Sequence, residues 1–292
     1  MSVRSVRRVA HAKINPFLRV LRRRDDGYHE VESLVVPITL ADRLTATPSD
    51  ALHVDVRGDR ALANAVEAGG MNLALVAALA LADACPGAGG AEVTIDKRIP
   101  VAAGLGGGSA DAAATLLALN ELWGCGIDAL TLAGIAERIG SDVPAMLVGG
   151  PVLVSGRGER LAPVEVPPLS WVLVSFGTGV RSPDAYRWWD EAHGRSGPDP
   201  GAVLSAATAG DAEALGPLLF NDLEAPVSDR HPEIARAHDT LLGAGALGAV
   251  MSGSGASVVG LARDDADARR IAGTLDGDFD ALDVVGPAPH AG

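Results

Sequence analysis

This chain is most constrained by four glycines within five positions, residues 104–108, followed at once by a long stretch rich in alanine and leucine. Before them, residues 91–96 alternate apolar and polar side chains, which predicts a strand. After them, residues 110–123 contain no glycine or proline and predict a helix. Glycines have no Cβ atom, so their N–H groups can approach an anion closely, and the first turn of a helix leaves further N–H groups unpaired. The order strand, glycine loop, helix is therefore suited to binding phosphate.

The ordinary alternative for such a glycine cluster is a simple turn, and the residues alone leave both interpretations open. Neither of the two commonest phosphate loops fits. The G-x-x-x-x-G-K-[ST] loop requires a lysine before Ser109, where Gly108 stands, and the dinucleotide fingerprint belongs to a strand and helix that open a chain. Phosphate binding is favoured by Pro100 and by Ser109-Ala110-Asp111 at the start of the helix.

Composition argues against several classes of protein. The 292 residues carry a net charge of −13, so a nucleic-acid partner is not expected and an anionic substrate would need a local basic patch. Hydrophobic residues make up 48% of the chain, enough for a substantial core. No apolar run reaches the ~18 residues of a membrane helix, and no secretory signal is predicted. Two cysteines, Cys85 and Cys125, are too few for a disulfide framework, so we expect them to be reduced and the protein to be cytoplasmic.

Lysine is scarce in this chain. Of 24 basic residues, only Lys13 and Lys97 are lysines. Such a bias commonly reflects genome composition. Alternatively, a lysine that remains is one whose compact point charge cannot be replaced by the wide fork of arginine. Both interpretations stay open for each lysine.

The beginning of the chain predicts a hairpin. Residues 10–22 read as a strand interrupted at Asn15-Pro16, Asp25-Asp26-Gly27 supplies the turn, and residues 28–40 form the return strand. Lys13 lies two positions before Asn15, so both side chains point to the same face. The alternative for Asn15 is Asn-Pro turn chemistry alone.

Three segments resemble the motifs of the GHMP kinase superfamily, in the family's order. The ATP loop is matched by P-V-A-A-G-L-G-G-G-S-A-D-A-A at residues 100–113. The first motif is matched by A-K-I-N followed by a hairpin and G-Y-H at residues 12–29, and the third by residues 248–261. Within the superfamily, the loop is most similar to that of the kinases that act on 4-diphosphocytidyl-2-C-methyl-D-erythritol. The resemblance covers nearly the whole chain.

The resemblance implies an α+β fold, the GHMP kinase fold. Its N-terminal half is like the second domain of ribosomal protein S5, and its C-terminal half has ferredoxin-like layers. We place the boundary in the proline-containing loop at residues 162–169, which predicts domains at 1–161 and 162–292. The site is expected in the cleft between the halves.

The implied reaction is ATP-dependent phosphorylation of the 2-hydroxyl of 4-diphosphocytidyl-2-C-methyl-D-erythritol, a step of non-mevalonate isoprenoid synthesis. The implied partners are ATP, Mg²⁺ and this small molecule, with no nucleic acid and no membrane, and the oligomeric state is open between monomer and homodimer. The residues that the resemblance assigns to ATP are Asn72, Lys97, Pro100, Ala103, Gly104, Gly106, Gly107, Gly108 and Ser109. Those assigned to the substrate are Asn15, Tyr28, His29, Asp142 and Tyr186. Ser109 is also the candidate magnesium ligand.

Lys13 and Asp142 are the implied catalytic residues. G-S-D-V-P at residues 140–144 resembles the family's G-A-D-V-P, whose aspartate is the catalytic base. A tertiary alcohol is a poor nucleophile, so a base in contact with it helps, and Lys13 would polarise the alcohol and keep the carboxylate ionised. The structural alternative for Asp142 is a helix N-cap before Pro144.

The cytosine is expected to stack between Tyr28 and Tyr186, the only tyrosines of the chain, while His29 reads its edge. Pro183 disturbs the family motif that precedes Tyr186, whose alternative role is ordinary packing. His29 is otherwise an exposed strand residue.

Two further segments match the family with open alternatives. Asn72 fits a donor to adenine, but Met71 departs from the family's aspartate, and Asn72 is alternatively a helix N-cap. Asn221-Asp222-Leu223-Glu224 matches a family segment, and we interpret it as a capped helix start.

Two other functions remain possible from the sequence. A homoserine or mevalonate kinase would share the loops but would have no use for Tyr28-His29, and turnover of homoserine or mevalonate would identify it. A non-catalytic nucleotide-binding regulator would bind ATP without turnover, and the joint presence of Lys13 and Asp142 argues against it.

Overall fold

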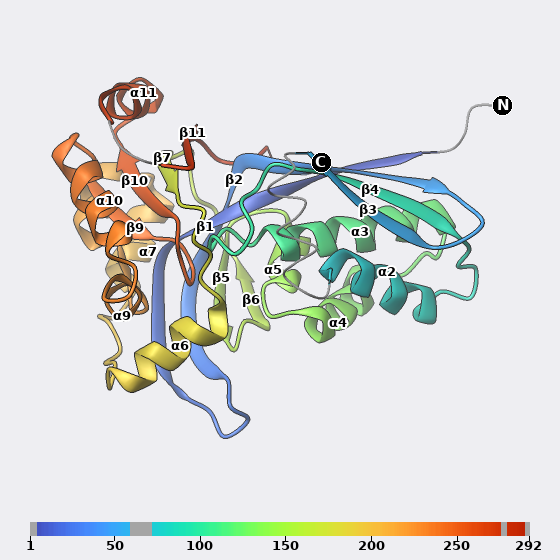
Figure 1. Cartoon of the computed structure of the whole chain (residues 1–292). Coiled ribbons are helices and arrows are strands. Elements are labelled where there is room, and N and C mark those ends of the chain that lie inside the picture. The colour runs from blue at the N-terminus through green and yellow to red at the C-terminus, as the bar shows by residue number, and fades with distance from the viewer. Residues whose placement is uncertain (1–4, 59–71, 276–278, 290–292) are drawn as a thin grey trace. The chain divides into compact units, whose positions relative to one another are not determined.

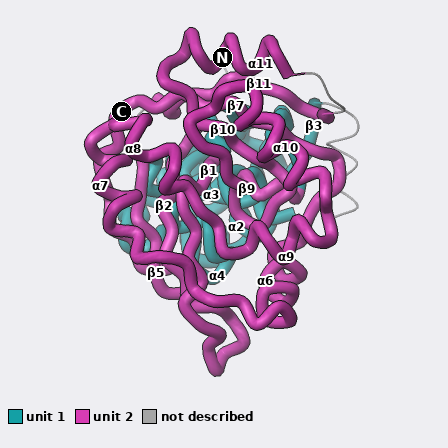
Figure 2. The backbone as a smooth tube through the Cα atoms, turned by 90° about the vertical axis from the view of Figure 1, so that its left-hand side faces the viewer, with its two compact units in different colours: residues 1–12, 40–101, 106–149 teal, residues 13–39, 102–105, 150–292 magenta. Residues whose placement is uncertain are grey.

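The computed structural model describes residues 5–58, 72–275 and 279–289, and the chain divides into two compact units. Unit 1 comprises residues 1–12, 40–101 and 106–149, and unit 2 comprises residues 13–39, 102–105 and 150–292 (Figure 2). The units interleave along the chain because the two opening strands, β1 (Val6–Arg23) and β2 (His29–Pro48), run through residues of both. The predicted boundary after residue 161 stays a prediction.

Unit 1 is a sheet covered by helices. Its strands follow the order β3 (His53–Gly58), β4 (Ala91–Lys97), β2 and β1, parallel between β3 and β4 and antiparallel between β4 and β2. Its helices are α2 (Leu73–Ala84), α3 (Gly107–Trp123), α4 (Ala129–Ile139) and α5 (Val143–Val148). Figure 1 shows these helices gathered on one side of β3 and β4. Their inward alanine and leucine side chains pack with Val93 and Ile95 of β4 in one core.

The helix after the glycine loop, α3, begins at Gly107, three residues earlier than predicted. It ends at Trp123, where Gly124 takes the left-handed conformation that commonly closes a helix. Its alanine side chains are short, so α3 packs closely in the unit 1 core. The glycine loop thus leads into a long and well-anchored helix.

Unit 2 contains the rest of the hairpin and a second sheet. The hairpin strands extend into the order β8 (Phe220–Asn221), β1, β2, β5 (Val152–Gly156) and β6 (Arg160–Pro163). The second sheet is antiparallel, in the order β11 (Ala281–Val285), β7 (Ser170–Ser175), β10 (Val258–Ala262) and β9 (Gly248–Met251). The helical elements are α6 (Ser182–Glu191), α7 (Gly201–Ala209), α8 (Ala212–Leu215), the 3₁₀ turn η1 (Gly216–Leu218), α9 (Glu224–Ser228), α10 (Pro232–Gly243) and α11 (Asp265–Thr274).

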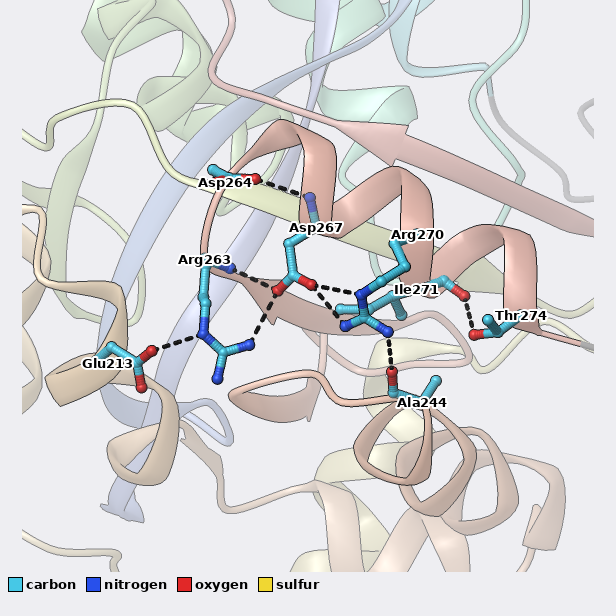
Figure 3. Close-up of polar contacts among 8 residues, drawn as sticks. All are labelled: Glu213, Ala244, Arg263, Asp264, Asp267, Arg270, Ile271 and Thr274. Carbon is cyan, nitrogen blue, oxygen red and sulfur yellow. Dashed lines mark hydrogen bonds and ion pairs between the residues drawn. The ribbon is translucent and has the colours of Figure 1, made fainter.

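Charged side chains hold the last helix of unit 2, α11, in place (Figure 3). The Asp267 carboxylate accepts hydrogen bonds from Arg263 and from Nε and Nη2 of Arg270, the latter at 2.9 and 2.6 Å. Arg270 also donates to the carbonyl of Ala244 (3.1 Å), and Arg263 donates to Glu213 of α8 (2.8 Å). Burial raises the pKa of Asp267, but the hydrogen bonds and charges of Arg270 and Arg263 outweigh it, and the net pKa is lowered. The network therefore ties α11 to α8 and to the end of α10.

The hairpin differs from the prediction in two ways. The predicted break at Asn15-Pro16 is wrong, since β1 continues through both residues. Proline lacks an N–H group, but a strand tolerates it wherever the ladder does not require that donor. The return strand, predicted to end at residue 40, continues to Pro48, because Arg43 to Pro48 pair with β4.

The prediction that both cysteines are reduced is also wrong. Cys85 and Cys125 form a disulfide within unit 1, with their Cα atoms 5.5 Å apart. Cys85 directly follows α2 and Cys125 comes shortly after α3, and the two helices pack in the same core. The cysteines lie 40 positions apart in sequence, so only the packing of the two helices reveals that they meet.

Across the described part of the chain, the helices are all too short or too polar to cross a membrane.

Candidate active site

Lys13 lies on β1 and is only 3% exposed. Its ammonium donates hydrogen bonds to Oδ1 of Asn15 (2.6 Å) and to the carbonyl of Gly104 (2.7 Å). Asn15 donates in turn to Ser33 Oγ (2.8 Å), and Ser33 donates to the carbonyl of Phe17 (2.7 Å). The prediction that Lys13 and Asn15 share a face is confirmed. This chain of hydrogen bonds fixes the ammonium against the glycine loop within unit 2.

At Gly104 the backbone geometry requires glycine. Its φ is +76°, and a Cβ atom there would overlap the carbonyl of Ser252. The Gly104 carbonyl that binds Lys13 also accepts from the Ser252 hydroxyl (3.1 Å), and the neighbouring Ala103 carbonyl accepts from Ser257 N–H (3.1 Å). Residues 102–105 therefore join Lys13 to the loop between β9 and β10 in unit 2.

In unit 1 the glycine loop becomes the start of α3. Gly106 holds the N-cap position with φ +68°, and no side chain caps the helix. Gly107 is tightly packed, because a Cβ atom there would lie 2.9 Å from Ile99 Cγ2 and 3.1 Å from Lys97 Nζ. The next residue, Gly108, is exposed. The uncapped N–H groups of the first turn and the helix dipole make this end of α3 suitable for phosphate oxygens.

Lys97 is buried below that helix start. Its ammonium donates to Oδ2 of Asp42 and to Oδ2 of Asp111, both at 2.6 Å. Asp42 also accepts from the backbone N–H groups of Arg98 (2.5 Å) and Ile99 (2.9 Å). The ion pairs connect β2, the end of β4 and the first turns of α3. The predicted place of Lys97 near the nucleotide phosphates stays a prediction.

The buried charges of this cluster shift two pKa values. Burial lowers the pKa of Lys97, but the carboxylates of Asp111 and Asp42 more than offset this, and the pKa lies above its usual value. Burial raises the pKa of Asp111 to about 7, although Lys97 opposes the rise. Oδ1 of Asp111 is buried without a hydrogen-bond partner, which agrees with a carboxyl that takes up a proton readily. Sequence reasoning missed Asp42 altogether, and it used Asp111 only as part of the loop motif.

Asp142 occupies the N-cap position of α5 and is exposed. Its side chain makes no capping hydrogen bond, whereas Asp128 at the start of α4 accepts from Thr131 N–H (2.8 Å). A capping role therefore does not explain the Asp142 carboxylate, which is not engaged by the helix that follows it. Its role as catalytic base stays a prediction.

Asn72 caps α2. Its Oδ1 accepts from Ala74 N–H (2.9 Å), which confirms the N-cap interpretation. The cap uses only the oxygen of the amide, and the contact of Asn72 with adenine stays a prediction. Met71 lies outside the described residues.

His29, at the start of β2, contacts two residues of α6 in unit 2. Its Nε2 lies 2.9 Å from Oδ1 of Asp190, and its ring stacks on Tyr186 with centroids 4.8 Å apart and planes at 21°. A carboxylate only accepts hydrogen bonds, so we infer that Nε2 of His29 carries a proton; in the tautomer with its single proton on Nε2, Nδ1 is an acceptor. Tyr28 is 51% exposed, with the Arg157 guanidinium 5.2 Å from its ring centroid.

Sequence reasoning missed Asp190, which contacts His29. It follows Tyr186 by four positions, so the two side chains share one face of α6. This four-residue spacing from Tyr186 is the sequence signal that could have identified Asp190. The predicted stacking of a cytosine between Tyr28 and Tyr186 stays a prediction.

Asn221-Asp222-Leu223-Glu224 is not a capped helix start, which corrects the prediction. The N-cap of α9 is Leu223, and no side chain caps that helix. Asn221 instead donates hydrogen bonds to the carbonyls of Met251 and Gly253.

The residues present fit a magnesium ion that arrives with ATP. Within residues 5–58, 72–275 and 279–289, no three histidine, cysteine, aspartate or glutamate side chains are grouped to hold a metal. Magnesium bound with a nucleotide commonly takes one or two protein ligands and completes its shell with phosphate oxygens and water. The hydroxyl of Ser109, in the first turn of α3, is suited to such a contact.

Replacing Gly108 with valine should weaken ATP binding by roughly 100-fold and leave the fold intact. A Cβ atom at Gly108 meets only Leu73 Cδ1, at 3.6 Å, so the structure has room for the side chain. The valine methyl groups would then stand over the N–H groups that face the phosphates. Calorimetric titration with ATP measures the loss, and a thermal melt checks the fold.

Gly134→Val on α4 is the matched control, because a Cβ atom there meets nothing within 4 Å. It should carry the same cost of valine in a helix without any change in ATP affinity. If Gly108→Val binds ATP as tightly as this control, the loop does not bind phosphate.

Comparison with known proteins identifies the family of this chain. The model described as GHMP kinases N terminal domain matches residues 72–150, and GHMP kinases C terminal matches residues 203–280. The 4-diphosphocytidyl-2-C-methyl-D-erythritol kinase of Symbiobacterium thermophilum is 46% identical over 87% of this chain and 89% of its own length. That of Pelotomaculum thermopropionicum is 44% identical over 90% and 91%.

Solved structures give the same assignment. A crystal structure of 4-(cytidine 5'-diphospho)-2C-methyl-D-erythritol kinase is 36% identical and superposes with a TM-score of 0.79 over 97% of this chain and 100% of that one. The homoserine kinase of Cytophaga hutchinsonii, 20% identical with a TM-score of 0.70 over 99% and 96% of the two chains, shares the fold. The chain therefore belongs to the GHMP kinase family and, within it, to the group of 4-diphosphocytidyl-2-C-methyl-D-erythritol kinases.

Proposed function

We propose that this protein transfers the γ-phosphoryl group of ATP to the 2-hydroxyl of 4-diphosphocytidyl-2-C-methyl-D-erythritol. The observation that carries the choice of substrate is the cluster of His29, Asp190 and Tyr186. It offers an aromatic face and an oriented hydrogen-bond acceptor, which suit a pyrimidine base. Homoserine and mevalonate have no such base, so kinases for them would not need the cluster.

The ATP phosphates bind at the start of α3. Residues 106–109 present backbone N–H groups and the positive end of the helix dipole, and Ser109 adds a hydroxyl. A magnesium ion bound there with ATP supplies neutralisation of phosphate charge. The packing of Gly107 against Lys97 holds this end of the helix in one position.

Asp142 and Lys13 act on the alcohol. The Asp142 carboxylate takes the hydroxyl proton as the oxygen attacks the γ-phosphorus, the bond from that phosphorus to ADP breaks, and ADP leaves. The Lys13 ammonium stabilises the negative charge that develops on the oxygens. Two observations support these roles: the Asp142 carboxylate is exposed and makes no capping hydrogen bond, and the Lys13 ammonium is held by Asn15 and the Gly104 carbonyl.

His29 selects cytosine over uracil. With Nε2 donating to Asp190, Nδ1 accepts a hydrogen bond from the exocyclic amino group of cytosine. Uracil carries a carbonyl oxygen in that place, so two acceptors would face each other. Tyr186 stacks on the His29 ring and so helps to hold the ring in this orientation.

Release of ADP with each candidate substrate tests the proposal. The wild-type protein should turn over the cytidine diphosphate compound, should be at least 10-fold poorer in kcat/KM with its uridine analogue, and should be inactive with homoserine and mevalonate. The unmodified sugar phosphate, 2-C-methyl-D-erythritol 4-phosphate, is the control for recognition of the nucleotide part. Equal kcat/KM with and without the cytidine would overturn the role of the His29 cluster, and turnover of homoserine or mevalonate alone would replace the proposed substrate.

A further inference from the structure

Asn221 and Glu224 bind the backbone of a distant loop. Nδ2 of Asn221 donates to the carbonyls of Met251 (2.7 Å) and Gly253 (2.8 Å). The carboxylate of Glu224 accepts from Met251 N–H (2.8 Å), and Oδ1 of Asn221 accepts from Leu223 N–H (2.9 Å). Two neighbouring side chains thus hold both polar groups of Met251 and the start of the loop between β9 and β10.

That loop lies directly against Lys13. At Gly253 the φ is +56°, and a Cβ atom would lie 2.8 Å from both Lys13 Nζ and the carbonyl oxygen of Gly104. The Ser252 hydroxyl donates to the same Gly104 carbonyl that accepts from Lys13. A shift of residues 252–253 would therefore open or close the space around the ammonium.

Asp222, the residue after Asn221, holds β1, the strand that carries Lys13. Its Oδ2 accepts from Val20 N–H (2.7 Å) and Gly197 N–H (2.9 Å), and its own N–H donates to the Leu18 carbonyl (2.9 Å). The β8 strand lies parallel to β1, with Asn221 opposite Leu18. The part of β1 that follows Lys13 is thus bound by the same short segment that binds the loop.

We propose that Asn221-Asp222-Leu223-Glu224 is a clamp that positions Lys13 for phosphoryl transfer, by holding β1 on one side of the ammonium and residues 251–253 on the other. The clamp residues touch neither substrate nor nucleotide in this proposal, so they are positioning residues. The inference rests on the proposed function only in giving Lys13 a catalytic role.

The amide of Asn221 is the part of the clamp that another side chain cannot replace. Two carbonyl acceptors require two N–H donors, and Leu223 N–H requires an acceptor on the same side chain. An aspartate has the same shape but presents only oxygens to the two carbonyls, and the site is buried. Asn221→Asp therefore releases the loop with a minimal change of volume.

Asn221→Asp in the full-length chain should lower kcat by roughly 10- to 100-fold while KM for ATP changes less than about 3-fold, because misplacement of a catalytic group by about 1 Å costs up to 10²-fold. A thermal melt establishes that the variant is folded at the assay temperature. If Asn221→Asp does not fold, Asn221→Ala removes the donors without adding charge and is measured in the same way.

Asn120→Asp is the matched control. Asn120 also bridges backbone groups with its amide, donating to the Ile127 carbonyl (2.9 Å) and accepting from Ile127 N–H (3.1 Å), but it lies in unit 1 on α3. It should lose stability and keep kcat within 2-fold. A folded Asn221→Asp protein with the kcat of this control would overturn the proposal.

Hydrogen exchange gives a readout that does not depend on the substrate. In Asn221→Asp, the amides of Ser252 and Ser257, which bond to the carbonyls of Ser257 (2.9 Å) and Ala103 (3.1 Å), should exchange at least 10-fold faster. In Asn120→Asp they should not change. Unchanged exchange in Asn221→Asp would overturn the clamp even if the proposed substrate is correct. Absence of turnover by the wild-type protein would count against the proposed function instead.

Discussion

Asp142→Asn should lower kcat by roughly 10²–10⁴ while the protein folds and binds ATP as before. The asparagine has the same shape but cannot take the proton of the substrate alcohol. The wild-type carboxylate is exposed and makes no capping hydrogen bond to α5, so the substitution removes no contact that the helix needs. Steady-state release of ADP measures kcat, and calorimetry measures the affinity for ATP.

Asp128→Asn separates catalysis from capping. Asp128 also precedes a helix of unit 1, but its carboxylate accepts from Thr131 N–H and its pKa is lowered by that backbone hydrogen bond. Since asparagine caps a helix about as well as aspartate, this control should leave the melting temperature nearly unchanged and should keep kcat. If Asp142→Asn also keeps kcat, Asp142 is not the base.

The glycine loop was predictable because its chemistry is local. Strand β4, the glycines and α3 follow one another in sequence, and each has a composition that favours its structure. The same holds for the Asn72 cap, whose hydrogen-bond partner lies two residues away. Where the partner is close in sequence, the residue type and its spacing are sufficient.

Contacts between distant segments were not predictable in this way. Asp42 meets Lys97 across 55 positions, Cys85 meets Cys125 across 40, and Asp190 meets His29 across 161. Their meeting depends on how β2 pairs with β4, how α2 packs with α3 and where α6 lies. A single sequence records none of these arrangements, because each depends on how elements that are distant along the chain pair and pack.

The segment Asn221-Asp222-Leu223-Glu224 shows that even a local sequence motif can be misinterpreted when its partners are distant in sequence. Residue types at Asn221 and Asp222 are those of a helix cap, and a short helix does follow. The competing acceptors and donors, on β1 and on the β9–β10 loop, are distant in sequence and close in space. A cap motif therefore indicates that the side chain forms hydrogen bonds with backbone groups, but it does not identify the segment to which those groups belong.

Lys13→Arg should lower kcat by roughly 10² or more without unfolding the protein. The ammonium is held between Asn15 Oδ1 and the Gly104 carbonyl, and the backbone of Gly253 leaves no room even for a Cβ atom beside it. A guanidinium keeps the positive charge and the donors, but it is wider, and its charge would sit away from the position of the Lys13 ammonium, where we propose that the reacting oxygens bind. The retained charge and donors should keep the loss of melting temperature small, so the effect falls on kcat.

Arg19→Lys on the same strand is the matched control. Arg19 pairs with Glu32 at 3.1 Å and its side chain is 22% exposed, and lysine can keep the charge of this ion pair. Its kcat should stay within 2-fold of the wild type, whereas that of Lys13→Arg should not. If Lys13→Arg turns over substrate normally, the retention of lysine at this position reflects no requirement for a point charge. The scarcity of lysine in the chain would then be a matter of composition alone.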